Sequence, residues 1–132
     1  MTLALIGCGR ISFKHVEAAV KNSDRIKLVA TCDPKLDRAE AKAAEYRKAI
    51  PDAKVAVYAD YREMLAKVKP DVCAIATESG YHPAISIACS EAGAHVICEK
   101  PMALSTTDAD AMIAAAKKAR RTLTVCFQNR FN

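Results

Sequence analysis

The sequence contains no tryptophan, and aromatic residues make up only 5% of its 132 positions. It has no apolar run near the roughly 18 residues that a membrane-spanning helix needs. It also lacks an N-terminal charged region followed by a long apolar one, which is the pattern of a secretory signal. We therefore expect a soluble, cytoplasmic protein that has no membrane partner.

Aromatic residues are also missing around the densest basic tract, KKARR at Lys117 to Arg121. A nucleic-acid patch needs aromatic or groove-reading side chains beside its cations. Cations at the C-terminal end of a helix complement the helix dipole, and this tract falls where a helix is predicted to end. The net charge of +5 therefore does not predict a nucleic-acid partner.

No Cys-x-x-Cys pair occurs, and no histidine stands at the spacing of a zinc ligand. The six cysteines are Cys8, Cys32, Cys73, Cys89, Cys98 and Cys126. Four of them lie inside or at the end of apolar, strand-like segments, where reduced thiols act as small buried hydrophobes. The pattern predicts structural free thiols and no metal site.

The signals of β-hairpins are absent as well, because no Asn-Gly or Asp-Gly dipeptide separates two strands. Strand-like and helix-like segments alternate from end to end instead. The predicted strands cover residues 3–6, 26–32, 55–58, 71–77, 95–98 and 123–127. The predicted helices follow the first glycines to about residue 22 and cover residues 35–49, a short stretch after 60, 83–92 and 105–120.

Such alternation predicts parallel strands joined by right-handed crossovers. At this length it predicts one α/β domain over residues 1–132, a doubly wound parallel Rossmann sheet with helices on both faces and strand order 3-2-1-4-5-6. Capping boxes are predicted at Asp60 with Glu63 and at Ser105 with Asp108, and a helix stop at Gly93. Ligands of such sheets bind at the carboxyl ends of the strands.

Two glycines one residue apart follow the first predicted strand, in ALIGCGRIS at residues 4–12. Gly7 permits a tight turn, and Gly9 lets a pyrophosphate approach the backbone without a Cβ in the way. The following N–H groups and the helix dipole favour negative charge. Ser12 takes the place of the third small residue of a G-x-G-x-x-G pattern. A plain strand–helix turn is the alternative interpretation.

An acidic residue, Asp33, ends the second predicted strand. A carboxylate there accepts hydrogen bonds from the adenosine ribose and repels a 2′-phosphate, which favours NAD over NADP. The alternative is that Asp33 only begins the turn before Pro34. Lys35 and Arg38 follow closely, and a cation accommodates the extra phosphate, so NADP stays allowed.

The fourth and fifth predicted strands are followed by polar segments, ATESGYHP at residues 76–83 and CEKP at residues 98–101. His82 is predicted either to cap the next helix or to touch a cofactor. Glu99 and Lys100 directly follow an apolar strand, and a lysine there donates to a substrate oxygen. The alternative for Lys100 is an ordinary exposed lysine at a strand end.

Together these motifs resemble the glucose-fructose oxidoreductase/inositol dehydrogenase family (Gfo/Idh/MocA). The resemblance rests on LIGCGRIS with His15, CDP at 32–34, the T-x-S-G-x-H segment at 77–82 and AGAHVICEKPMALS at 92–105. FQNRFN at 127–132 resembles the nucleotide-sugar 3-dehydrogenase branch. The resemblance implies an NAD(P)-dependent oxidoreductase that moves a hydride between nicotinamide and a carbon of a sugar, nucleotide sugar or cyclitol.

The resemblance also implies roles for individual residues. Cofactor contacts are implied for Gly7, Gly9, Arg10, Ile11, Asp33, Thr77, Ser79, His82, Glu99, Lys100 and Gln128. Lys100 is implied as the catalytic lysine that polarises the reacting oxygen. Lys100, Asn129 and Arg130 are implied to lie near the substrate.

Members of this family continue into an α/β substrate domain, which this chain, ending at Asn132, does not contain. We expect the 132 residues to bind a dinucleotide but to show little turnover alone. The resemblance implies a homo-oligomer for the full-length protein. Two alternatives remain: a non-catalytic dinucleotide-sensing module, which gives Lys100 no role, and another Rossmann protein such as an S-adenosylmethionine enzyme.

Overall fold

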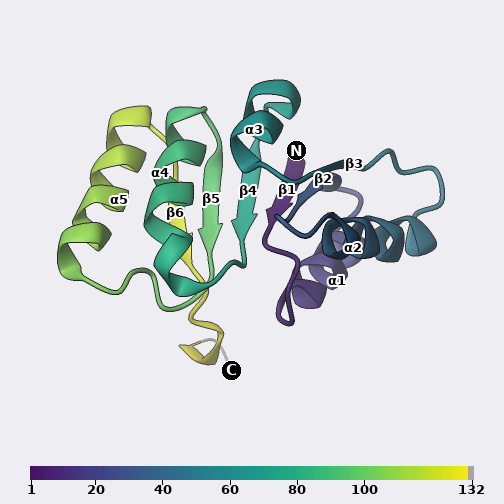
Figure 1. The fold of residues 1–132 in the computed structure, drawn as a ribbon, viewed down its shortest axis with the longest axis horizontal. Coiled ribbons are helices and arrows are strands. Elements are labelled where there is room, and N and C mark those ends of the chain that lie inside the picture. The colour runs from purple at the N-terminus through teal and green to yellow at the C-terminus, as the bar shows by residue number, and fades with distance from the viewer. Residues whose placement is uncertain (131–132) are drawn as a thin grey trace.

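The computed structural model describes residues 1–130 and contains one six-stranded sheet (Figure 1). The strand order is β3-β2-β1-β4-β5-β6, and every neighbouring pair is parallel. The strands are β1 (Thr2–Ile6), β2 (Lys27–Cys32), β3 (Ala56–Tyr58), β4 (Val72–Ile75), β5 (His95–Cys98) and β6 (Leu123–Val125). The predicted fold class and strand order are confirmed.

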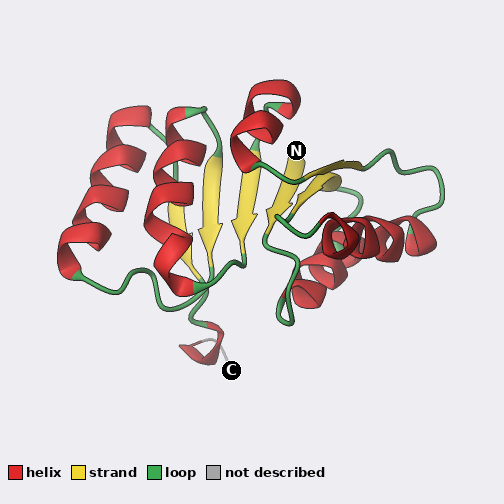
Figure 2. Ribbon diagram, viewed as in Figure 1, coloured by secondary structure: helices red, strands yellow, loops and turns green. Residues whose placement is uncertain are grey.

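Helices alternate with the strands and cover both faces of the sheet (Figure 2). The α-helices are α1 (Ser12–Lys21), α2 (Leu36–Ala49), α3 (Tyr61–Val68), α4 (His82–Glu91) and α5 (Thr106–Ala119). Two short 3-10 helices are η1 (Ser79–Tyr81) and η2 (Gln128–Arg130). Among residues 1–130, no helix combines the length and apolar character needed to cross a membrane.

Alternation along the central strand β1 divides the apolar core into two layers. Leu3 and Leu5 pack with the buried residues of α1 and α2, whereas Ala4 and Ile6 pack with those of α3, α4 and α5. All four side chains are at most 5% exposed. A strand buried on both faces lacks polar alternation, which is why these segments read as continuous apolar runs.

The fourth strand is shorter than the predicted 71–77 and ends at Ile75. Its partner β1 ends opposite it, because Ile6 pairs with Ile75 and the chain then turns at Gly7. Ala76 still donates to Ile6 O at 2.8 Å, but Thr77 no longer has a strand beside it. The residues after Ile75 therefore leave the sheet at its carboxyl edge.

The predicted capping box at Asp60 forms only in part. The Asp60 carboxylate accepts a hydrogen bond from Arg62 N at 2.8 Å, so Asp60 does cap α3. The prediction for Glu63 is wrong, because its carboxylate accepts a hydrogen bond from the Lys67 ammonium, one turn further along the helix. An opposite charge at i+4 outcompetes the return bond to the cap backbone.

The other predicted helix ends agree with the structure. Ser105 caps α5 by accepting from Asp108 N and donating to the Asp108 carboxylate. Gly93 has a φ of +90° just after α4, the left-handed conformation that ends many helices. Lys117 and Lys118 lie in the last turn of α5, as the dipole argument predicted.

Candidate functional site

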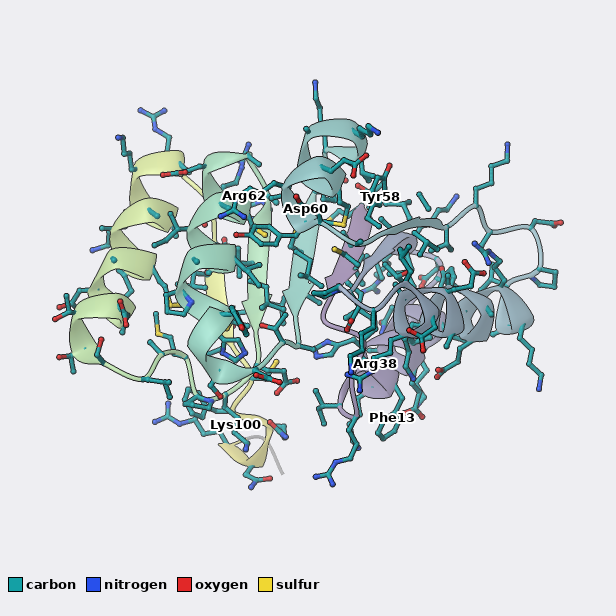
Figure 3. The ribbon with its side chains drawn as sticks, viewed as in Figure 1. Phe13, Arg38, Tyr58, Asp60, Arg62 and Lys100 are labelled. Carbon is teal, nitrogen blue, oxygen red and sulfur yellow. The ribbon has the colours of Figure 1, made fainter. Side chains whose placement is uncertain are left out.

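A cavity of about 880 Å³ opens at the carboxyl ends of the strands, where the sheet order reverses between β1 and β4. The strand arrows in Figure 1 end at this lower edge of the sheet, and Phe13, Arg38 and Lys100 lie along the same edge in Figure 3. The predicted site residues that line the cavity are Gly7, Gly9, Arg10, Ile11, Asp33 and Thr77.

The two glycines of the first turn have different structural roles. Gly7 adopts a φ of +90°, and a Cβ on it would lie 2.5 Å from Thr77 N and 2.6 Å from Ala76 C. Only glycine therefore fits between the β1 turn and the backbone after β4. A Cβ on Gly9 would meet nothing within 4 Å, so the space in front of Gly9 is open to the cavity.

The N-terminus of α1 adjoins this space, since Gly9, Arg10 and Ile11 line the cavity. Its cap residue is Ile11, and no side chain in the described part of the chain caps the helix there. Ser12 N and Lys14 N donate to Gly9 O and Ile11 O, and the positive end of the helix dipole favours an anion at the cavity. Ser12 is fully buried and donates to Gly9 O, so it fills the third small position of the motif.

Asp33 also lines the cavity and is 8% exposed. One oxygen accepts from Cys8 N at 2.9 Å and the other from Lys35 N at 2.8 Å. The bond to Lys35 is the turn predicted as the alternative role of Asp33. The bond to Cys8 also ties the acid to the glycine turn, so turn formation and a position in the cavity occur together.

Two cationic residues, Lys35 and Arg38, line the same cavity as Asp33. The thiol of Cys8 contacts Cys32 O. Burial, followed by the charge of Asp33, raises the pKa of Cys8 to about 12. The thiol therefore stays neutral, and the Asp33 carboxylate is the one negative group contributed by this turn.

A second, smaller cavity of about 300 Å³ contains the predicted substrate residues. It is lined by Lys100, Phe127, Gln128, Asn129 and Arg130. Residues 128–130 form η2 directly after β6, and Lys100 follows β5, the neighbouring strand. The structure thus brings together two segments that the sequence separates, with two cations, Lys100 and Arg130, on one small hollow.

The ring of His82 is buried and contacts backbone carbonyls of the protein. It is 1% exposed, and its ring nitrogens lie 2.8 Å from Pro101 O and 3.0 Å from Thr77 O. Both nitrogens are thus engaged by backbone carbonyls. His82 joins the segment after β4 to the segment after β5, a role that the sequence did not reveal. Ser79 begins η1, half-buried, outside both cavities.

Glu99 directly follows β5 and is not among the residues that line either cavity. Its backbone N donates to Ile75 O at 2.9 Å, and its carboxylate lies 2.8 Å from the Nε2 atom of His15. Burial, followed by the Glu99 charge and hydrogen bond, raises the pKa of the Cys126 thiol to about 11. Glu99 is therefore held through its backbone by the end of β4 and through its side chain by α1.

Sequence reasoning gave His15 no role of its own, although His15 belonged to the motif that carried the resemblance. A spacing signal was present. His15 stands four residues after Ile11, so both lie on one face of α1, and Ile11 lines the larger cavity. The partner of His15 was not visible, because 84 positions separate the two residues.

The fold and the site together define a dinucleotide-binding domain: an anion-binding glycine turn at the switch point of a parallel sheet, with an acid after the second strand. Residues 1–127 match a family model, GFO_IDH_MocA, described as the oxidoreductase family with an NAD-binding Rossmann fold. The chain belongs to this family. In the described residues, no group of three or more His, Cys, Asp or Glu side chains is placed to hold a metal ion.

Individual relatives agree with this membership. The chain is 34% identical over 131 residues to D-glucoside 3-dehydrogenase of Escherichia coli, covering 99% of this chain and 36% of the relative. It is 33% identical to myo-inositol 2-dehydrogenase of Thermotoga maritima, covering 100% of this chain and 37% of the relative. The chain thus spans little more than a third of the length of these relatives.

A solved structure shows the same fold in complex with ligands. The WlbA dehydrogenase of Chromobacterium violaceum, crystallised with NADH and UDP-GlcNAcA, superposes with a TM-score of 0.91 at 39% identity. The match covers 100% of this chain and 36% of that one. The sequence resemblance to the nucleotide-sugar branch of the family is therefore accompanied by structural similarity to a member of that branch.

Proposed function

We propose that this chain is the cofactor-binding part of an NAD(P)-dependent dehydrogenase acting on a sugar, nucleotide sugar or cyclitol. The observation that carries the proposal is the open space before Gly9, next to the uncapped N-terminus of α1. Open space at a helix N-terminus supports binding of an anion such as a diphosphate. The adenosine then lies toward Asp33 and the nicotinamide over β4 and β5, because the dinucleotide crosses the switch point.

Nicotinamide, when bound, would supply the hydride chemistry between a carbon that bears a hydroxyl and the corresponding carbonyl carbon. In this proposal Lys100 donates a hydrogen bond to the reacting oxygen and so stabilises the charge that develops on it. Asn129 and Arg130 orient the substrate in the smaller cavity. Arg10, Ile11, Thr77, Ser79 and Gln128 complete the cofactor contacts.

The two cations of the smaller cavity favour a substrate that carries negative charge. Lys100 and Arg130 both line that hollow, and guanidinium groups bind phosphates and carboxylates with paired hydrogen bonds. We therefore favour an acidic or phosphorylated sugar, as in a nucleotide sugar, over a neutral cyclitol. Turnover with neutral inositols alone, and none with nucleotide sugars, would reject this preference.

Cofactor choice follows from the neighbours of Asp33. The carboxylate favours the two free hydroxyls of NAD, whereas Lys35 and Arg38 in the same cavity reduce the penalty for a 2′-phosphate. We propose NAD as the preferred cofactor with measurable NADP binding. Arg38→Ala is expected to weaken NADPH binding and to leave NADH binding nearly unchanged, and isothermal titration with both ligands measures the difference.

We also propose a cytoplasmic location, supported by the cysteines. All six are free, five of them buried, and unpaired thiols are typical of reducing compartments. The homo-oligomer implied by the family resemblance stays a prediction, and sedimentation analysis of the natural polypeptide tests it.

The decisive test of the enzymatic proposal is the substitution Lys100→Ala in the polypeptide produced from the natural reading frame. The proposal predicts that this variant loses hydride transfer but keeps its affinity for NADH. Hydride transfer is measured through the absorbance of NADH, with glycosides, inositols and nucleotide sugars as substrates. A dinucleotide-sensing module is the second candidate function. It predicts the same NADH affinity but no hydride transfer from any of these substrates in the unsubstituted protein.

A further inference from the structure

A hydrogen bond between His15 and Glu99 joins two segments that the proposed mechanism treats separately. His15 Nε2 lies 2.8 Å from Glu99 Oε1, with only 12% and 14% of the two side chains exposed. The three i,i+3 and i,i+4 ion pairs of the helices each have at least one partner more than 40% exposed. Exposed pairs contribute little to stability, whereas a shielded pair fixes the geometry of both partners.

The pair connects opposite sides of the switch point. His15 belongs to α1, the helix that opens the diphosphate site, and Glu99 directly follows β5. The backbone of Glu99 is fixed to the sheet by its bond to Ile75 O. Its side chain still has rotatable bonds, so the direction of the carboxylate depends on the groups that contact it. The described contact of this carboxylate is the one with His15, at 2.8 Å.

We propose that His15 is a positioning residue that holds the Glu99 carboxylate for the ribose on the nicotinamide side of the dinucleotide. This inference rests on the proposed function, because that function places the nicotinamide half over β4 and β5. A carboxylate has about four acceptor positions, and the bond to His15 occupies one of them. The remaining positions accept hydrogen bonds from ribose hydroxyls. In this arrangement α1 both binds the diphosphate and, through His15, orients the Glu99 carboxylate that binds the ribose.

A purely structural pair makes a different prediction from a positioning pair. Losing a structural contact disturbs the whole domain, and every ligand that needs the fold binds less well. Losing a positioning contact affects only ligands that reach Glu99. ADP contains the adenosine and the diphosphate but no second ribose, so its contacts end at the glycine turn. NADH contains the same groups and the nicotinamide riboside in addition.

The experiment compares NADH and ADP binding by calorimetry in the unsubstituted chain and in His15→Ala. We expect His15→Ala to weaken NADH binding by about tenfold, the effect of losing a hydrogen bond to a charged group, and to leave ADP binding within about twofold. Equal weakening of both ligands, or no change in either, overturns the positioning role. Absence of NADH binding in the unsubstituted chain contradicts the proposed function itself, and the inference with it.

Three further variants sharpen the result. His15→Gln keeps a side-chain N–H donor and is expected to recover most of the NADH affinity. In a Glu99→Gln background, His15→Ala is expected to have little added effect, since it acts through Glu99. Lys21→Ala removes the exposed pair with Glu17 on the same helix and serves as the matched control with no change expected. Additive losses in the double variant contradict the proposal.

Discussion

Each glycine of the first turn has its own physical requirement. At Gly7 the backbone after β4 leaves no room for a side chain and φ is positive. At Gly9 the space is open, and in the proposed function the diphosphate approaches there. The fold thus requires glycine at one position, and the proposal assigns the other to binding, although both appear as the same letter in the motif.

The two glycines give a matched prediction. Gly7→Ala is expected to lower the free energy of unfolding by about 3 kcal/mol or more, through backbone strain and the contact with Ala76 and Thr77. Gly9→Ala is expected to change it by less than about 0.5 kcal/mol and to weaken NADH binding instead. Urea unfolding and calorimetric titration of both variants separate the effects. A stable Gly7→Ala variant would contradict the packing of this turn.

The segments after β4 and β5 are joined to each other by His82, at the first residue of α4. Its two ring nitrogens contact carbonyls at Thr77 and Pro101. Pro101 follows Lys100, so the contact fixes the backbone next to the proposed catalytic lysine. Because a backbone carbonyl carries no residue-specific signal, the sequence alone left open whether His82 touched a cofactor or served the helix end.

His82→Ala is expected to destabilise the chain by about 3 kcal/mol, because it removes a buried side chain and the hydrogen bond that its ring N–H donates to a backbone carbonyl. Thermal or urea unfolding measures the change. Tyr81→Ala is the neighbouring control, since Tyr81 is 62% exposed and is expected to cost less than about 0.5 kcal/mol. Similar losses in the two variants would show that His82 does not join the two segments.

Elements with local signals were predictable from the sequence. Alternating apolar runs and helix formers predicted all six strands in order, and Ser105 and Gly93 marked helix ends correctly. The prediction for Glu63 failed because Lys67 competes for its carboxylate. The predicted end of β4 was wrong because the length of a strand depends on its partner, here β1. The periodicity of one segment carries no information about that partner.

At the scale of the whole molecule, the candidate site divides in the same way. The cavity residues Gly7, Gly9 and Asp33 were predictable because strand order alone brings strand ends to one edge. The contact of His15 joins residues 84 positions apart, and the contacts of His82 are to backbone carbonyls 5 and 19 positions away, so no spacing rule predicts either. The resemblance to a family placed Glu99 at the site but did not reveal what holds it.

The buried thiols make the stability of the molecule sensitive to alkaline pH. Burial raises the pKa of Cys8, Cys32 and Cys98 from 9.0 to about 12. Above pH 9 the unfolded chain releases these protons while the folded chain keeps them. The contribution of the thiols to the free energy of unfolding is therefore fully present below pH 9 and is lost as the pH rises toward 12. Each thiol contributes a slope of up to about 1.4 kcal/mol per pH unit.

Urea unfolding between pH 7 and pH 11 tests this dependence. The free energy of unfolding is expected to be level with respect to these thiols up to about pH 8.5 and to decrease steeply above pH 9. Cys98→Ala removes one titrating group, so its curve is expected to fall less steeply above pH 9, whatever its stability at pH 7. Parallel curves for the two proteins would show that burial does not shift this thiol.

The central claim is that the turn between β1 and α1 receives the diphosphate of a nicotinamide dinucleotide. Backbone amide NMR during a titration with NADH tests it most directly, because the amides that would donate to the phosphates belong to Gly9, Arg10 and Ile11. We expect these signals to shift most and to saturate together, while the signal of Gly93, just after the C-terminal end of α4, stays in place. Saturable binding that leaves the Gly9 to Ile11 amides unmoved, or no binding by a chain whose spectrum is folded, would contradict it.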